Sequence, residues 1–289
     1  MRVAVTGASG LIGRALTRHL STAGHDPVPF ARPGDWDPDR GFVDLEKLGS
    51  CDAVVHLAGV GIADARWTDD QKRAIRESRT VGTGLIARTL AELDDGPRIL
   101  VSGSAIGWYG DTGDRSVGEG EPAGTDFVAS IVQDWEAAAH PAVDAGIRVA
   151  FCRTAQVLST DGGPLAKQLP FFKFGLGGKV GSGRQWMTWI SIDDEVRAIE
   201  WLLTHEISGP VNLASPEPVR NADFAKALGS ALHRPTFVIP KLGPQVLYGR
   251  ELVDVLLMTS QRVEPRVLLE SGFEFTQPTL DVALADLLR

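Results

Sequence analysis

Cysteine, tyrosine and long apolar runs are scarce in this chain, and positive charge is in deficit. The two cysteines, Cys51 and Cys152, cannot form a disulfide framework and are too few for a metal site of their own, so no metal is expected. The formal net charge of -8, without a basic stripe carrying interleaved aromatic residues, argues against nucleic acid as a partner. No run approaches membrane-spanning length, and the N-terminus lacks the apolar segment of a signal peptide. The expected location is a reducing compartment, the cytoplasm, with no membrane partner.

What is present suits a chain with a substantial buried core. Of the 289 residues, 43% are apolar and 23% are charged, enough for one large domain or two modest ones. Strand-like and helix-like segments alternate, which predicts an α/β fold with a doubly wound parallel sheet of the Rossmann type. The expected strands are residues 2–6, 28–31, 53–57, 99–101 and 149–152, and the expected helices are residues 11–20, 70–93 and 127–145. The strand at 28–31 is the weakest of these because Pro29 has no N–H to donate.

A glycine-rich excursion at about residues 158–186 interrupts the alternation. Excursions of this length inside a compact protein are more often functional than idle, so a substrate lid is expected there. A helix at 194–204 and a strand at 211–213 return to the sheet, and residues 221–232, 242–258 and 278–288 have helical patterns. The expected organisation is a cofactor-binding domain at 1–155 completed by about 187–215, a lid at 156–186, and a smaller, mostly helical substrate domain at 216–289.

The most informative segment is VTGASGLIG, residues 5–13, which joins the first strand to the first helix. Gly7 is expected to make the tight turn, Gly10 to let the backbone approach a pyrophosphate, and Gly13 to let helix and strand pack closely. Free N–H groups at the helix start then face the phosphates. The segment predicts a dinucleotide site formed by Gly7, Ser9, Gly10, Leu11, Ile12 and Gly13, with an ordinary strand-to-helix loop as the alternative.

Further motifs accompany this segment: HLAG at 56–59, SGSAIGWYG at 102–110, DWEAA at 134–138 and WISIDD at 189–194. With them the chain resembles the extended short-chain dehydrogenase/reductases, and within these the epimerase-like branch of nucleoside-diphosphate-sugar epimerases. The resemblance covers nearly the whole chain, including a tail at 247–288 similar to that branch's own C-terminal domain. It implies a nucleotide-binding Rossmann fold and the activity of an oxidoreductase or isomerase.

The type of cofactor depends on the end of the second strand. An Asp or Glu about 20 residues past the glycines binds the ribose of NAD, whereas an arginine there accommodates the 2′-phosphate of NADP. Here Arg32 follows the strand and no acid stands at its end, so NADP(H) is favoured over NAD(H). A solvated surface arginine is the alternative for Arg32. Arg14 is either a second cation near that phosphate or a surface residue.

The resemblance implies further cofactor contacts. Asp44 and Leu45 would border the adenine, although Asp44 could instead cap the following turn. The other implied contacts are Leu57, Ala58, Gly59, Arg79, Ser102 and Arg153, with Arg153 near the nicotinamide ribose. His56 is expected to be a satisfied core histidine at a strand end.

The acid/base residues depart from the family's pattern. The relatives use a Tyr-x-x-x-Lys pair, in which the lysine lowers the tyrosine pKa for proton transfer. Neither of the two tyrosines here, Tyr109 and Tyr248, has a lysine four residues on. Aligning Glu136 with the family's acidic residue places Val128 and Val132 at the Tyr and Lys positions.

Three other residues are candidates for the chemistry. Ser104 matches the family's catalytic serine but is a poor proton donor alone, and Tyr109 could supply a phenol or be a packed turn aromatic. Arg79 stands where relatives often carry Asn. Its guanidinium could polarise a carbonyl or hold an anionic substrate, or it could be an exposed helix arginine paired with Glu77 or Asp69.

The expected lid is locally basic, which suits a phosphorylated or carboxylated ligand. Its cations are Lys167, Lys173, Lys179 and Arg184, against one acid, Asp161. Arg184 and Trp186 are the predicted substrate contacts, while Trp186 and Trp189 are expected mainly to pack the lid on the sheet. Asp193 and Asp194 are typical of a helix N-terminus rather than of a metal pair.

Three functions remain open at this point. The first is an NADP-dependent oxidoreductase or epimerase acting on a small polar, nucleotide-linked or carbonyl-bearing substrate. The second is a catalytically silent protein that senses NADPH, and the third is an interaction protein in which the nucleotide is structural. A small-molecule substrate is the expected partner, and the residues leave a homodimer open without fixing the oligomeric state.

Overall fold

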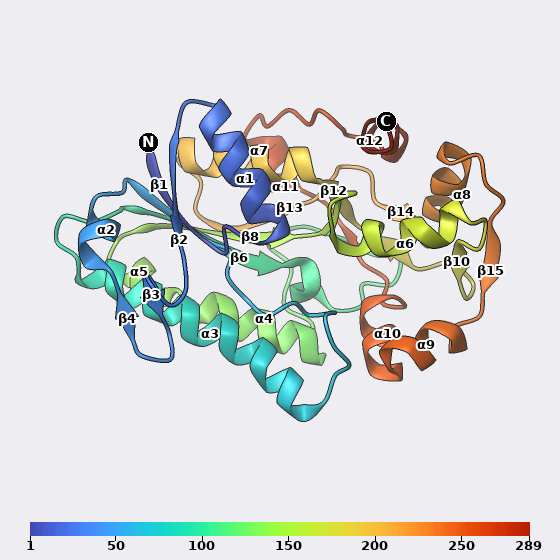
Figure 1. Cartoon of the computed structure of the whole chain (residues 1–289), viewed down its shortest axis with the longest axis horizontal. Coiled ribbons are helices and arrows are strands. Elements are labelled where there is room, and N and C mark those ends of the chain that lie inside the picture. The colour runs from blue at the N-terminus through green and yellow to red at the C-terminus, as the bar shows by residue number, and fades with distance from the viewer.

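The core of the structure is a parallel sheet. In the computed structural model, which describes residues 1–289, six strands lie in the order β13-β8-β6-β5-β1-β2 (Figure 1). All pair in parallel. Their bounds are β1 Arg2–Thr6, β2 Asp26–Phe30, β5 Ala53–His56, β6 Ile99–Ala105, β8 Arg148–Thr154 and β13 Gly209–Leu213. The predicted doubly wound α/β fold is confirmed.

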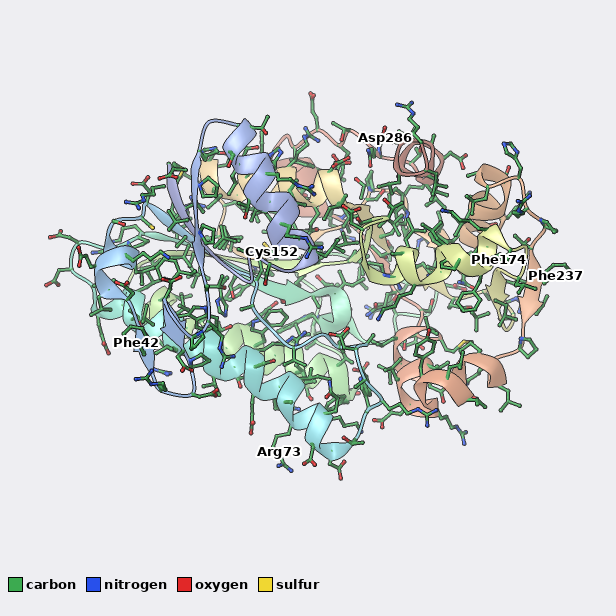
Figure 2. All side chains as sticks on the ribbon, in the orientation of Figure 1. Phe42, Arg73, Cys152, Phe174, Phe237 and Asp286 are labelled. Atoms are coloured by element: carbon green, nitrogen blue, oxygen red, sulfur yellow. The ribbon has the colours of Figure 1, made fainter.

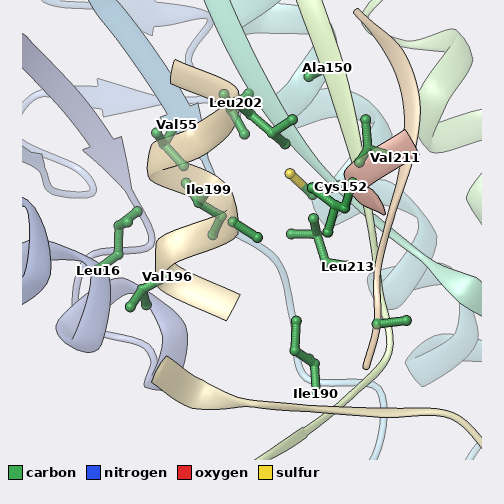
Figure 3. Close-up of a cluster of buried hydrophobic side chains, with 14 of the residues drawn as sticks. Leu16, Val55, Ala150, Cys152, Ile190, Val196, Ile199, Leu202, Val211 and Leu213 are labelled. Carbon is green, nitrogen blue, oxygen red and sulfur yellow. The ribbon is translucent and has the colours of Figure 1, made fainter. Parts of the chain in front are cut away.

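Helices cover both faces of this sheet (Figure 1). On one face lie α1 (Leu11–Thr22) and α7 (Ile192–Thr204), and on the other lie α3 (Asp69–Glu92), α4 (Phe127–Ala137) and α5 (His140–Asp144). Alternate residues of β1 supply the two faces: Val3 and Val5 join the core cluster of Leu16, whereas Ala4 joins the cluster of Leu85. Figure 3 shows the first cluster, in which Leu16 of α1 and Val196 of α7 lie near one another.

The prolines of β2 are tolerated because β2 is an edge strand. The amide of Asp26 donates to the Met1 carbonyl, so with a period of two the nitrogens of Pro27 and Pro29 face away from β1. Positions that lack a donor therefore fall on the open side of the strand.

Two predicted helices are each broken in two. Residues 127–145 form α4 and α5, separated at Ala138 and Ala139 before Pro141. Residues 242–258 form α9 (Leu242–Tyr248) and α10 (Arg250–Leu256), separated by Gly249 at φ 92°, a conformation that ends a helix.

The expected irregular excursion contains a helix, α6 (Gly163–Lys173), which the pattern of glycines and prolines concealed. Leu165, Leu169 and Phe172 recur at helical spacing and pack in a third core cluster with Phe224 of α8 (Asn221–Ala231) and Leu284 of α12 (Leu280–Leu287). This cluster lies on the side of the molecule where the exposed Phe174 and Phe237 project, across the view from Phe42 (Figure 2).

Short elements complete the chain. Paired strands are β3 (Trp36–Asp37) with β4 (Phe42–Val43), β7 (Ser116–Val117) with β16 (Arg262–Val263), β9 (Gln156–Leu158) with β12 (Trp189–Ser191), β10 (Gly178–Val180) with β15 (Phe237–Ile239), and β11 (Trp186–Met187) with β14 (Val219–Arg220). The remaining helices are α2 (Leu45–Gly49), α11 (Arg266–Glu270) and the 3-10 turn η1 (Ile106–Tyr109). None of the helices combines the length and apolar character needed to cross a bilayer.

Candidate cofactor and substrate site

The glycine turn between β1 and α1 has no room for side chains at two of its three glycines. Gly7 has φ 69°, and a Cβ there would lie 2.8 Å from the Leu57 carbonyl carbon. A Cβ on Gly13 would lie 2.2 Å from the Gly7 carbonyl oxygen. Gly7 therefore makes the expected tight turn, and Gly13 allows the expected close packing of helix and strand.

Gly10 is different, because it is exposed and stands at the N-cap of α1. As a glycine it offers no side-chain cap, so N–H groups of the first helical turn stay free to bind an anion. Ser9 beside it is also exposed, and its carbonyl accepts from Arg14 Nη1 at 2.5 Å. The turn is therefore open on the side where a diphosphate would approach.

The loop after β5 packs directly on this turn. Leu57 and Ala58 touch the space beside Gly7, and Gly59 is exposed. His56, at the end of β5, is fully buried, with Nδ1 2.7 Å from Thr6 Oγ1. Burial lowers the pKa of His56 to about 4. The residue is the expected core histidine at a strand end, but it is only partly satisfied, because Nε2 has no hydrogen-bond partner.

At the end of β2 the structure corrects one premise of the NADP prediction. No acid stands at the strand end in sequence, but the chain folds back and brings the Asp35 carboxylate within 2.8 Å of the Ala31 amide. Asp35 is engaged there by Lys47 at 2.8 Å. Arg32 is exposed, lies over the Trp36 ring and pairs with Asp39 at 2.9 Å.

Of the predicted adenine contacts, Leu45 is an exposed apolar side chain and Asp44 has a structural task. Asp44 Oδ1 accepts from the Lys47 amide at 2.9 Å and so caps α2, which is the alternative role expected for it.

The predicted catalytic hydroxyls are buried and committed to internal acceptors. Ser104 Oγ donates to Glu136 Oε1 at 2.6 Å, and Tyr109 Oη donates to Asn212 Oδ1 at 2.8 Å. Burial raises the pKa of the Tyr109 phenol. Each is only 5% exposed, so neither presents a free proton to a ligand in this conformation. For Tyr109 the packed-aromatic alternative describes the observed placement.

Arg153 is part of the same network, which corrects its expected cofactor contact. Its guanidinium is 2% exposed, binds both oxygens of Glu136 at 2.8 and 2.9 Å, and lies 3.9 Å from the Trp108 ring centroid. Ser102 is fully buried within β6. The side chains of both residues therefore lie beneath the site rather than lining it. Glu136 is the shared acceptor of Ser104 and Arg153, a role that nothing in the sequence indicates beyond its place in the DWEAA motif.

The two valines expected at the acid/base positions are buried. An added Cβ on Gly107 of η1 would lie 2.5 Å from Val128 Cγ1 and 3.7 Å from Val132 Cγ2, so both valines pack on η1, which follows β6. An apolar contact thus occupies the face of α4 where the relatives carry their pair.

Arg79 is half-buried and does not pair with Glu77 or Asp69, so the surface-pair alternative is wrong. Nη1 donates to the Val60 and Ile75 carbonyls at 2.9 and 3.0 Å, and the guanidinium carbon lies 4.9 Å from the Trp135 ring centroid. Burial lowers the pKa of Arg79 to about 10.

Residues 57–68, here called the strap, cross from the end of β5 towards the C-terminal helices. Arg66 donates to the Val246 and Leu247 carbonyls at the end of α9, and Lys167 of α6 donates to the Ala63 carbonyl at 3.2 Å. Between strap, α6 and α9 lies a cleft of about 420 Å³, lined by Ala63, Asp64, Ala65, Arg66, Lys167, Leu247 and Tyr248. Of the predicted lid cations only Lys167 lines it, and the strap was not anticipated.

The predicted substrate contacts at Arg184 and Trp186 are placed differently. Arg184 is exposed, and no side-chain partner holds its guanidinium. Two guanidinium groups, of Arg220 and Arg262, already lie 4.1 and 4.5 Å from the Trp186 ring centroid, and its indole N–H donates to Asp114. Trp186 therefore has a packing role, as does the fully buried Trp189. Asp193 and Asp194 lie in the first turn of α7, as expected.

Fold and site together define a Rossmann protein of the extended short-chain dehydrogenase/reductase type. Residues 3–214 match the NAD dependent epimerase/dehydratase family, and residues 239–287 match a domain of unknown function, DUF1731. The chain belongs to the NAD dependent epimerase/dehydratase family.

Similar proteins occur in bacteria and animals. Epimerase family protein Mb2239 of Mycobacterium bovis is 43% identical, over 98% of this chain and 96% of its own. Epimerase family protein SDR39U1 of Bos taurus is 36% identical over the whole of both chains. Among solved structures, human epimerase family protein SDR39U1 (isoform 2) with NADPH superposes with a TM-score of 0.89 at 32% identity, covering 99% of each chain. The nucleoside-diphosphate sugar epimerase of Corynebacterium glutamicum has a TM-score of 0.79 at 37% identity, over 100% of this chain and 58% of that chain.

Proposed function

We propose that this protein binds NADP(H) and uses it as an oxidoreductase or epimerase on a small polar substrate with a carbonyl or sugar group. The observation that carries the proposal is the open glycine turn, in which Gly7 and Gly13 admit no side chain and Gly10 leaves the start of α1 uncovered. The similar human protein was crystallised with NADPH, which supports the same cofactor here.

Arg32 supports the phosphorylated form of the cofactor. Its side chain is 44% exposed and that of its partner Asp39 is 83% exposed. An exposed ion pair of this kind is worth at most about 1 kcal/mol, so a 2′-phosphate can displace Asp39 at little cost. Asp35, the acid nearest the strand end, is already bound by Lys47 and the Ala31 amide, which leaves it poorly available to a ribose hydroxyl.

A second candidate function is indicated by the hydroxyl groups of Ser104 and Tyr109, which already donate to acceptors within the protein. Because Ser104 and Tyr109 donate to internal acceptors and valines fill the acid/base positions, the protein could bind NADPH without turning over a substrate. The observation that favours this sensor function is that both hydroxyl protons are already hydrogen-bonded inside the protein. We retain catalysis as the first proposal because Arg79, near the carboxyl edge, is a cation without a carboxylate partner, and because a cleft lies between the strap, α6 and α9.

One pair of measurements tests the proposal. Fluorescence titration is expected to show tighter binding of NADPH than of NADH, and equal affinities would remove the NADP assignment. Stereospecifically deuterated NADPH is then incubated with a panel of carbonyl metabolites and the products are analysed by mass spectrometry. Transfer of the label to a product supports an oxidoreductase, whereas NADPH binding with no transfer across the panel supports the sensor.

A further inference from the structure

Arg79 is a half-buried cation without a counter-charge. No carboxylate lies within 4.0 Å of its guanidinium, and its only hydrogen bonds run from Nη1 to two backbone carbonyls. The Nε and Nη2 groups have no partner in the protein. Burial, with no carboxylate to oppose it, lowers the pKa of Arg79 to about 10, so the guanidinium stays charged at neutral pH. A charge held this way is costly unless an anion joins it.

The position of this cation is that of a ligand site. Arg79 lies under Gly59 at the carboxyl end of β5, the edge at which open parallel sheets bind ligands. A Cβ on Gly59 would contact Arg79 Cγ and Cζ at 3.6 Å, so the glycine keeps the guanidinium uncovered. Trp135, on which Arg79 stacks, lies three residues beyond Val132 on α4. The charge therefore stands beside the apolar face formed by Val128 and Val132.

The neighbouring cleft has a matching charge. Of the side chains that line it, Arg66 and Lys167 are cations and Asp64 is the one acid. Arg66 is bonded to backbone carbonyls rather than to a carboxylate, and Lys167 is 4.0 Å from Asp64. The cleft bordered by the strap is therefore positively charged, in the same sense as Arg79, whose guanidinium is bonded to the strap at Val60.

We propose that Arg79 binds the oxyanion of the substrate, a carboxylate or a phosphate, through its free Nε and Nη2 groups. The planar fork of a guanidinium matches a pair of such oxygens. This inference rests on the proposed function in that the anion lies beside the nicotinamide of a bound cofactor. It differs from a purely structural role, in which Arg79 only ties the strap to α3 through the Val60 carbonyl.

Matched variants separate the two roles. Arg79→Gln removes the charge but keeps a donor for the Val60 carbonyl, and Arg79→Lys keeps the charge but loses the fork. Ser78→Ala is the control for strap position, because Ser78 Oγ accepts from the Val60 amide at 3.1 Å. Arg73→Gln is the control for net charge, since Arg73 lies on the same helix and is exposed (Figure 2).

The experiment is calorimetric titration of pyruvate, inorganic phosphate and neutral acetamide into the protein, with and without NADPH. We expect at least one of the two anions to bind and acetamide not to bind. Arg79→Gln should weaken anion binding at least tenfold, Arg79→Lys should weaken it less, and Ser78→Ala and Arg73→Gln should leave it unchanged. Which anion binds more tightly distinguishes a carboxylated from a phosphorylated substrate.

Three results would overturn the inference: no binding of either anion, equal binding by wild type and Arg79→Gln, or competition between the anion and NADPH. Competition would place Arg79 in the cofactor site instead. Because the titration is also run without NADPH, failure of the cofactor to bind would reject the proposed function while the anion result stood separately.

Discussion

Arg32, which forms an exposed ion pair with Asp39 after β2, is the residue that we expect to distinguish NADP(H) from NAD(H). The two cofactors differ by one phosphate. Arg32 is held by Asp39 and, at 3.7 Å, by Asp37, so its charge is partly neutralised until a stronger anion arrives. A phosphate dianion offers more charge than either carboxylate and can accept from the same guanidinium. We therefore expect Arg32 to discriminate between the two cofactors through this exchange of anions.

Replacing Arg32 by Ala is expected to weaken NADPH binding at least tenfold and to leave NADH binding unchanged, because only the phosphorylated cofactor uses the guanidinium. Fluorescence titration with both cofactors measures this. Arg98→Ala removes an equal charge at the opposite, amino edge of β6 and should alter neither affinity. A parallel loss of NADPH and NADH binding in Arg32→Ala would show that Arg32 serves the fold instead.

Glu195 is a second residue whose environment has a measurable effect, here on the pH dependence of stability. It is fully buried in α7, accepts from Thr154 Oγ1 at 2.9 Å through one oxygen, and has no partner for the other. Burial raises its pKa to about 8, whereas the unfolded chain titrates near 4.5. Between pH 4.5 and about 8, the folded protein keeps a proton on Glu195 that the unfolded chain has released, so the free energy of unfolding falls as pH rises.

We therefore expect Glu195→Gln to flatten the pH dependence of the free energy of unfolding between pH 5 and 8. The limiting slope of this contribution is roughly 1.4 kcal/mol per pH unit. Urea unfolding at several pH values measures it, and the exposed Glu270→Gln serves as the control. Unfolding curves for wild type and Glu195→Gln that stay parallel across this range would mean that Glu195 is ionised in the fold.

At the scale of elements, the turn between β1 and α1 was accessible from the sequence because most of its constraints are local. An added Cβ on Gly10 or Gly13 would meet the Gly7 carbonyl oxygen within the same turn, and Gly7 has a positive φ. The contact of Gly7 with Leu57 and Ala58 comes from a distant segment. The network of Ser104, Glu136 and Arg153 was not accessible, since its members come from β6, α4 and β8 and their burial depends on the packed fold. Spacing matched Ser104 to a catalytic position but could not reveal where its proton points.

The breaks in predicted helices have the same origin. Periodicity continues through residues 138–139 and through Gly249, so apolar spacing alone predicts one helix where φ at Gly249 requires two. Conversely, α6 was hidden because Pro164 and Pro170 interrupt its pattern, although a proline at a helix start costs no hydrogen bond. Local backbone geometry, not hydrophobic pattern, decided both cases.

Gly13→Ala tests the turn as an element. Its Cβ would meet the Gly7 carbonyl oxygen at 2.2 Å, a backbone atom that cannot rotate away. We expect a loss of about 1–3 kcal/mol of stability from overpacking, together with loss of NADPH binding. Thermal unfolding and fluorescence titration measure the two effects. Gly49→Ala, where nothing lies within 4 Å of the added Cβ, is the matched control. Wild-type NADPH affinity in Gly13→Ala would show that the turn does not touch the cofactor.

At the scale of the whole molecule, the strap connects the sheet to the C-terminal helices across the cleft. Arg66 donates to carbonyls at the C-terminal end of α9, where a cation is favoured by the helix dipole, and Lys72 of α3 pairs with Glu251 of α10 at 2.5 Å. Neither contact belongs to a core cluster. The strap is therefore held to the C-terminal helices by polar contacts that can break without unfolding the sheet.

Arg66→Ala is expected to open the strap while leaving the global unfolding temperature within about 2 °C of wild type, because surface contacts contribute little to total stability. Hydrogen exchange followed by mass spectrometry should show faster exchange in residues 57–68 and 242–248 and no change in peptides from β6. The exposed Arg73→Ala, which pairs only with Asp70 at 3.5 Å, is the control. If exchange instead rises uniformly across the chain, Arg66 supports the entire fold. If it does not rise at all, the strap is held by contacts other than those of Arg66, such as the bond from Lys167 to the Ala63 carbonyl.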